Sequence, residues 1–140
     1  MRIHKGKPFF SYKDTYSLDD VLSTIILAGL VKFRDTLKER DINGKAYCVP
    51  IFDDNYEDVP QSDKWFEILD KIIFAFDDKN EPEVSSYKIG FKLLSDKSEG
   101  FCSISNQDGY DRYRKDVEDW NKKKQEGLDL FAKHYNSLWW

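Results

Sequence analysis

The chain has 140 residues, the usual size of one domain, so we expect a single domain over 1–140 with one hydrophobic core. Apolar residues make up 40%, charged residues 34% and aromatic residues 16% of the chain, which excludes a disordered polymer and predicts a core rich in rings. The formal charge of −4 gives no general attraction to polyanions, so nucleic acid is not an expected partner.

The first residues predict an arm followed by a long helix. No steady period runs through 1–16, so these residues are expected to form an irregular arm whose aromatic side chains pack onto the body. Ser17 is the expected N-cap of the helix, and Asn43-Gly44 is its expected stop. The apolar stripe of this helix recurs at steps of three and four residues and consists of Leu18, Leu22, Ile25, Ile26, Leu30, Phe33 and Leu37.

An acidic connection leads to the second helix. Its carboxylates over 53–58 have the alternating spacing of a calcium-binding loop, but Asp58 and Lys64 stand where such a loop requires Gly and Glu. We therefore expect a solvated turn. A helix over 62–76 follows, with Ser62 as its cap and a wide apolar stripe of Trp65, Phe66, Ile68, Leu69, Ile72, Ile73 and Phe76.

The segment 78–108 breaks the helical period and predicts a hairpin insertion. Apolar residues alternate with polar ones over 87–93, which indicates a strand, and 101–105 is the expected partner strand. The residues between them, 95–100, have the composition of a turn.

The last helix is expected from about Asp111 onward, and it contains two anomalies. Lys124 occupies a position of the apolar stripe, and Gly127 costs about 1 kcal/mol relative to Ala inside a helix. A bend, or a close approach by another chain or a ligand near 124–127, would explain both. The predicted fold class is mainly α, with three principal helices and a small antiparallel β-hairpin; α+β is the alternative.

Cysteine content and hydropathy indicate a reducing compartment. Cys48 and Cys102 are the only cysteines, too few to cross-link a small secreted fold, and no histidine or second cysteine lies at the spacing of zinc ligands. The longest apolar run, 25–31, is about a third of a membrane span. We expect no export signal, no membrane association and no metal site.

No catalytic motif is present in the sequence. It has no glycine-rich phosphate loop, no nucleophile elbow and no cysteine next to a general base, so enzyme activity is an alternative that no motif supports, and we expect no cofactor. The unusual feature is the end of the chain, where aromatic residues gather beside Lys133 and His134. These rings either pack back as core or line a pocket, in which rings stack on a base and cations receive phosphates.

Three segments resemble a family of small bacteriophage proteins. They are the helix opening Ser17-Leu18-Asp19, the run 65–76 and the ending 126–140. The family motifs are Trp-x-Leu-Asp, Trp-x-x-Ile-Leu-Asp-Lys-Met-Ile and Glu-Gly-Leu-x-Leu-Phe-x-Lys-Tyr-Phe-x-x-Leu-Trp. This chain departs from them at Tyr16 or Ser17, where the first Trp would stand, and at His134-Tyr135, which replace Tyr-Phe.

The resemblance implies a phage origin and a location in the host cytoplasm, and the family has no settled activity. Small phage proteins without enzyme activity often counter host defences, so two hypotheses follow. The first is a homo-oligomeric sponge that sequesters a nucleotide immune signal of the host. The second is a protein-binding module that occludes a host protein surface. Ligand-binding residues expected for the sponge are Lys32, Arg34, Trp65, Lys133, His134, Tyr135, Trp139 and Trp140.

Overall fold

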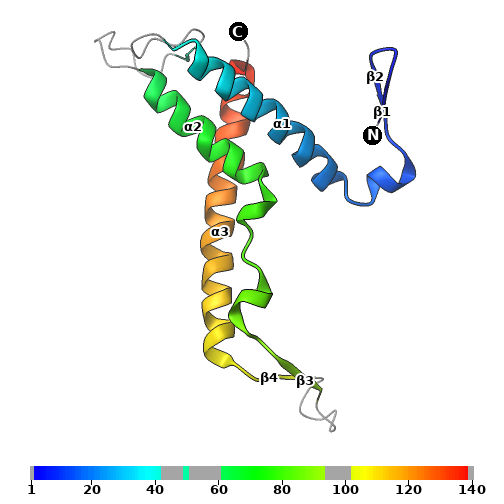
Figure 1. Cartoon of the computed structure of the whole chain (residues 1–140), viewed down its shortest axis with the longest axis vertical. Coiled ribbons are helices and arrows are strands. Elements are labelled where there is room, and N and C mark those ends of the chain that lie inside the picture. The colour runs from blue at the N-terminus through cyan, green and yellow to red at the C-terminus, as the bar shows by residue number, and fades with distance from the viewer. Residues whose placement is uncertain (1, 42–48, 51–60, 94–101, 139–140) are drawn as a thin grey trace.

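The chain is mainly helical. The computed structural model describes residues 2–41, 49–50, 61–93 and 102–138. Three principal helices carry two short antiparallel hairpins at the outer ends of the molecule (Figure 1). The predicted helix stop at Asn43-Gly44 and the acidic turn at 53–58 lie outside the described residues. Within the part that is described, no helix is both long and apolar enough to cross a membrane.

Helix α1, Leu18–Glu39, follows the predicted apolar stripe. Ser17 is its N-cap, as expected, but the hydroxyl makes no capping bond; the Ser17 carbonyl oxygen accepts from the N–H of Val21 at 3.1 Å. Leu30 and Leu37 are buried, whereas the first half of the helix extends away from the other two helices (Figure 1). The large apolar residues exposed on that half are Leu18, Leu22 and Ile25.

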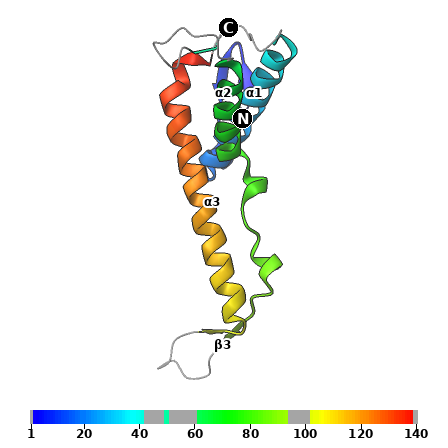
Figure 2. The ribbon, with the colours of Figure 1, turned by 90° about the vertical axis from the view of Figure 1, so that its left-hand side faces the viewer.

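Helix α2, Gln61–Phe76, packs along the C-terminal half of the longest helix, α3, Gln107–His134 (Figure 2). The expectation that Ser62 caps α2 is wrong, because Ser62 lies inside the helix with its side chain buried. Helix α3 begins four residues before its predicted start. Its cap is Asn106, whose side-chain oxygen accepts from the N–H of Gly109 at 3.0 Å.

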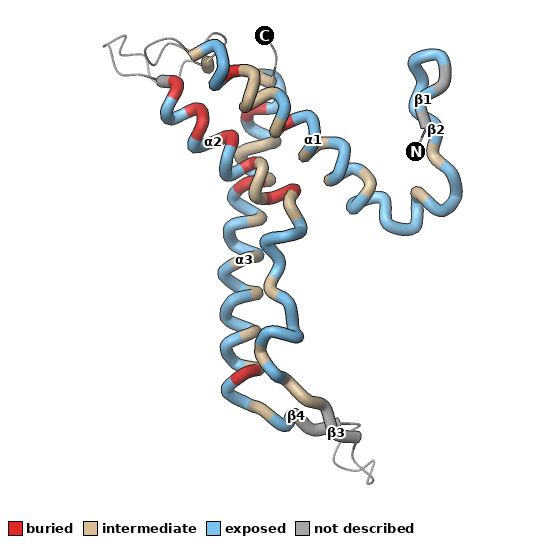
Figure 3. The backbone as a smooth tube through the Cα atoms, viewed as in Figure 1, coloured by how far each residue is buried: buried red, intermediate tan, exposed pale blue. Residues whose placement is uncertain are grey.

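The core lies where the three helices cross, at the end of the molecule that carries the C-terminus (Figure 3). Helix α1 supplies aliphatic side chains and α2 supplies most of the rings. From α3, the Phe131 ring meets Phe76 edge to face, with centroids 5.0 Å apart. Within the described residues, the buried apolar side chains are those of Leu30, Leu37, Trp65, Phe66, Leu69, Ile72, Ala75 and Phe76.

The two anomalies of the last helix have separate structural reasons. A β-carbon on Gly127 would overlap the carbonyl oxygen of Lys71 and lie 2.6 Å from the β-carbon of Ala75, so only glycine lets α2 and α3 approach this closely. The predicted close approach by another chain or a ligand is therefore wrong at Gly127, because the close neighbour is α2 of the same chain. Lys124 reaches over the Trp120 ring, with Nζ 4.6 Å from the ring centroid.

The segment between α2 and α3 runs down the other half of α3 (Figure 2). It contains two 3-10 turns, η2 (Asp78–Asn80) and η3 (Val84–Tyr87). The predicted strand over 87–93 is therefore too long, because Lys88 has a left-handed backbone with φ of 52°. Tyr87, which ends η3, contacts α3. Its ring centroid lies 5.3 Å from that of Tyr113, and its hydroxyl donates a hydrogen bond of 2.6 Å to a carboxylate oxygen of Asp116.

The predicted hairpin is present in shortened form. Strand β3, Phe91–Leu93, pairs antiparallel with β4, Cys102–Ile104. The register places Phe91 opposite Ile104. This hairpin lies at the far end of α3 from the core (Figure 1).

The N-terminal arm is more regular than expected. Strands β1, Arg2–His4, and β2, Lys7–Phe9, form an antiparallel hairpin, and Lys5 and Gly6 between them both have positive φ, as a two-residue type I′ turn requires. A 3-10 turn, η1, Tyr12–Thr15, then joins the hairpin to α1. The expectation that the arm packs its rings onto the body is wrong, since the hairpin stands apart from the helices (Figure 1).

Candidate functional site

Two residues of the predicted nucleotide site belong to the core. Trp65 has no exposed surface, and 7% of the surface of His134 is exposed. Their rings meet edge to face with centroids 5.4 Å apart, which joins α2 to the end of α3. Of the two interpretations of the C-terminal rings, core packing therefore applies to Phe131, which contacts Phe76, and to His134. A flat ligand would have to displace these contacts to stack on either ring.

The basic residues of the predicted site are spread over separate places. Arg34 binds Asp70 of α2 at 2.7 Å and Asp35 at 3.1 Å, so its guanidinium links α1 to α2. Lys32 lines a small groove of about 280 Å³ on α1. Lys133 lines a different groove, of about 470 Å³, on α3. The described structure does not bring these three cations together around one phosphate.

The groove at Lys133 has no net positive charge to hold a phosphate. Lys122 and Lys133 line it together with Glu126 and Asp129, whose carboxylates repel phosphate. Burial, helped by the neighbouring Lys133 ammonium, lowers the pKa of His134, so this histidine is neutral at pH 7 and adds no positive charge. Tyr135, which begins the short 3-10 turn η5 (Tyr135–Ser137), is exposed. Its ring packs edge to face with that of Phe131, with centroids 5.7 Å apart. Trp139 and Trp140 lie outside the described residues.

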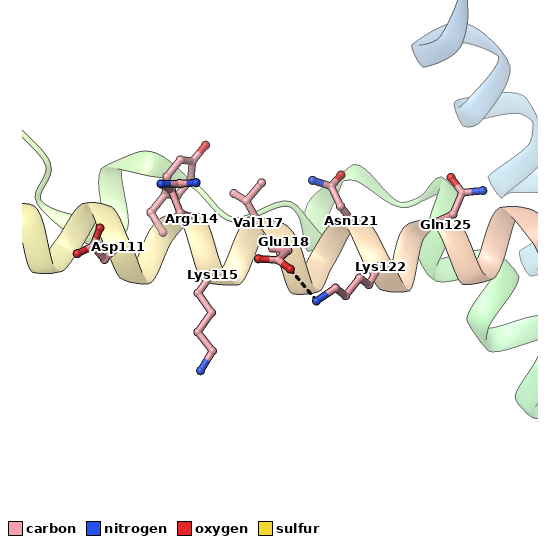
Figure 4. Close-up of a pocket in the computed structure, with 9 residues that line it drawn as sticks. Asp111, Arg114, Lys115, Val117, Glu118, Asn121, Lys122 and Gln125 are labelled. Atoms are coloured by element: carbon pink, nitrogen blue, oxygen red, sulfur yellow. Dashed lines mark ion pairs between the residues drawn. The ribbon is translucent and has the colours of Figure 1, made fainter.

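A groove along α3 has a volume of about 810 Å³ (Figure 4). All of its lining residues come from that one helix, and none of them is a predicted ligand residue. Charges of both signs line it, including an ion pair between Lys122 and Glu118 at 2.8 Å. Among the described residues, no group of three or more His, Cys, Asp or Glu side chains is placed to hold a metal ion.

The N-terminal arm is an exposed apolar surface that the sequence analysis missed. Residues 2–16 of the arm are described by the structure. Its large side chains are among the most exposed of the described chain: Tyr12 is 77% and Tyr16 78% exposed, and their rings meet edge to face at 5.3 Å. Ile3 and Phe9 on the hairpin are 71% and 64% exposed. The high aromatic content of this stretch is the signal in the sequence that points to it.

The arm is also basic, in contrast to the rest of the chain. Residues 1–16 contain four Lys or Arg and one Asp, whereas residues 17–140 contain 18 basic and 25 acidic side chains. Lys5, Lys7 and Lys13 are exposed. The arm therefore presents apolar rings among positive charges, while the body to which it is attached is acidic.

Comparison with protein-family models, with curated proteins and with solved structures finds no match to this chain at a significant level. The likeness to the phage family therefore rests on the three sequence segments quoted above.

Proposed function

We propose that this protein is a phage-encoded, non-enzymatic binding module that covers a surface of a host protein with its N-terminal arm. The observation that carries the proposal is the exposure of Tyr12 and Tyr16, 77% and 78%, next to exposed Ile3 and Phe9 on a hairpin that stands apart from the helices. Large apolar groups gathered on a surface in this way mark sites of protein interaction.

The energetics of interfaces favour this use of the arm. Tyrosine rings give large contact areas with only two side-chain torsions to immobilise, and aromatic residues dominate the binding energy of protein interfaces. An isolated two-stranded hairpin is only marginally stable in water. A partner that packs on β1 and β2, or that adds a strand to one of their open edges, would stabilise the hairpin.

The charge of the arm indicates the chemistry of its partner. The ammonium groups of Lys5, Lys7 and Lys13 are exposed on the same arm as the apolar side chains, and they would meet a carboxylate-rich rim around an apolar cleft. Such complementarity speeds association and weakens as salt rises. The acidic body of this module would repel the same partner, so the contact would be restricted to the arm.

The nucleotide sponge stays a prediction with less support. Its proposed cations Lys32, Arg34 and Lys133 lie in separate places, and Trp65 and His134 are core residues. A protein ligand needs none of these residues to move. We therefore place protein binding first.

The test compares affinity capture from a bacterial host lysate by the wild-type protein and by the double variant Tyr12→Ser/Tyr16→Ser. Tyr135→Ser is the matched control, because Tyr135 is also 64% exposed but lies at the other end of the chain. We expect one host protein of low isoelectric point to be retained by the wild type and the control and lost from the double variant. Equal capture by all three would contradict the assignment to the arm.

A second readout separates the two hypotheses. Native mass spectrometry of the wild-type protein with a panel of cyclic and ADP-ribose-type nucleotides should show the protein without added mass. A stoichiometric nucleotide adduct would place the sponge first.

A further inference from the structure

We infer that α1 has a second apolar face, and that this face pairs with the same face of another copy of the chain. One face of α1 packs on the other helices through Leu30 and Leu37. A second stripe remains on the surface at steps of four, three and four residues, which is the heptad spacing of paired helices. We call it the outer stripe; it consists of Leu18, Leu22, Ile25 and Gly29.

Gly29 indicates where the second helix would cross. Glycine in the middle of a helix costs about 1 kcal/mol relative to alanine, and at Gly127 this cost allows the close approach of α2. At Gly29, by contrast, a β-carbon would meet no atom of the described residues within 4 Å apart from its own stretch of helix. Two grooves, of about 280 and 350 Å³, both reach Gly29 and share Phe33. A helix crossing at Gly29 would come close enough to fill them with its own apolar side chains.

The exposed surface of the chain supports a second copy as the occupant. The accessible surface is 11077 Å², whereas a compact monomer of 16.6 kDa exposes about 7,600 Å² by the usual scaling with mass. The surplus over the whole chain, the arm included, is about 3,500 Å² by the same scaling, and a stable interface of standard size needs only about 800 Å² from each partner. A two-fold dimer uses one self-complementary patch twice, so a single stripe is sufficient.

Charge along α1 favours an antiparallel pair. Asp19 and Asp20 stand in the first turn, whereas the second half has a small excess of basic residues, Lys32, Arg34 and Lys38 against Asp35 and Glu39. An antiparallel arrangement about Gly29 sets the acidic end of each α1 beside this net-positive half of the other, whereas a parallel one sets the two acidic ends together. In the antiparallel pair, Leu22 of one chain faces Thr36 of the other, because each lies seven residues from Gly29.

This interface uses α1, whereas the host-protein surface proposed above uses the arm. The two proposals therefore fail separately: loss of the dimer leaves host-protein capture by Tyr12 and Tyr16 to be judged by itself, and failed capture leaves the dimer intact.

The first test measures molar mass by light scattering during size-exclusion chromatography, over a dilution series. We expect the wild type at twice 16.6 kDa and Ile25→Glu at 16.6 kDa. Val84→Glu is the matched control, since Val84 is 42% and Ile25 39% exposed, and it should keep the dimeric mass. Circular dichroism should show equal helix content in all three. A wild type that runs as one chain at every concentration, or an Ile25→Glu variant that stays dimeric, would overturn the proposal.

The second test determines whether the two α1 helices are antiparallel, and it introduces no charge into the outer stripe. In a background of Cys48→Ser and Cys102→Ser, a mixture of Leu22→Cys and Thr36→Cys chains should form a disulfide-linked dimer on mild oxidation. Leu22→Cys alone should not, because its two copies would lie about 21 Å apart along antiparallel helices. Efficient cross-linking of Leu22→Cys alone, or none in the mixture, would overturn the antiparallel pairing.

Discussion

Gly127 of α3 lies against the carbonyl oxygen of Lys71 in α2 so closely that a β-carbon has no room between them. This contact sets the distance between the two helices that contain most of the core. It also explains why a glycine stands in the middle of a long helix, because the packing of α2 on α3 requires it.

Replacing Gly127 by alanine should therefore destabilise the protein. The gain of about 1 kcal/mol in helix propensity is outweighed by overpacking, which costs about 1–3 kcal/mol, because the obstacle is backbone that has no rotamer to change. We expect a lower midpoint in urea unfolding followed by circular dichroism. Lys123→Ala, at an exposed position of the same helix, is the control and should stay within about 0.5 kcal/mol of wild type. A Gly127→Ala protein as stable as wild type would mean that α2 and α3 are not in this close contact.

The ion pair between Arg34 and Asp70 should stabilise the packing of α1 on α2 by a small amount. Nη1 of Arg34 and Oδ1 of Asp70 are 2.7 Å apart, but their side chains are 23% and 51% exposed, so solvent screens the attraction. A double-mutant cycle with Arg34→Gln and Asp70→Asn should give a coupling free energy of about 0.2–1 kcal/mol. The coupling should shrink in 1 M NaCl. A value near zero at low salt would contradict the pair.

Stability should fall as the solution is acidified through the range in which His134 takes up a proton. Burial and the nearby Lys133 lower the pKa of His134 in the folded state below its ordinary value of about 6.5. The unfolded chain therefore binds this proton more readily, so the stabilisation is complete above pH 6.5 and is lost as pH falls toward the folded pKa.

The variant His134→Asn isolates this effect from that of the carboxylates, which both proteins share. Urea midpoints measured between pH 5 and 7.5 should depend less on pH in the variant than in the wild type. Parallel pH profiles for the two proteins would show that His134 titrates as an exposed histidine does.

Loss of an aromatic side chain should lower the stability of the protein strongly in the core and only slightly in the arm. Trp65→Ala should cost about 3–5 kcal/mol, since the whole side chain is buried and leaves a cavity. Tyr12→Ser/Tyr16→Ser should change stability by less than about 1 kcal/mol, because both rings are mostly in solvent. Thermal unfolding measures both. A large loss in the tyrosine variant would return the arm to a structural role.

Local sequence patterns determined the existence and type of the main elements. The recurrence of Leu30 and Leu37, or of Leu69 and Ile72, on one side of a helix is a property of a few neighbouring turns and can be read without the rest of the chain. The first and last residues of each element were harder to predict. Helix α3 begins with polar residues after Asn106, outside any apolar stripe.

Only the tertiary structure decided which rings are core and which are surface. Trp65 and Tyr12 both lie in stretches rich in aromatic residues, yet one is buried against His134 and the other is exposed on the arm. The difference comes from contacts between segments far apart in the chain, which side-chain periodicity does not encode. The outer stripe of α1 follows the same logic: its residues repeat at helical spacing, but α2 and α3 cover only the adjacent face.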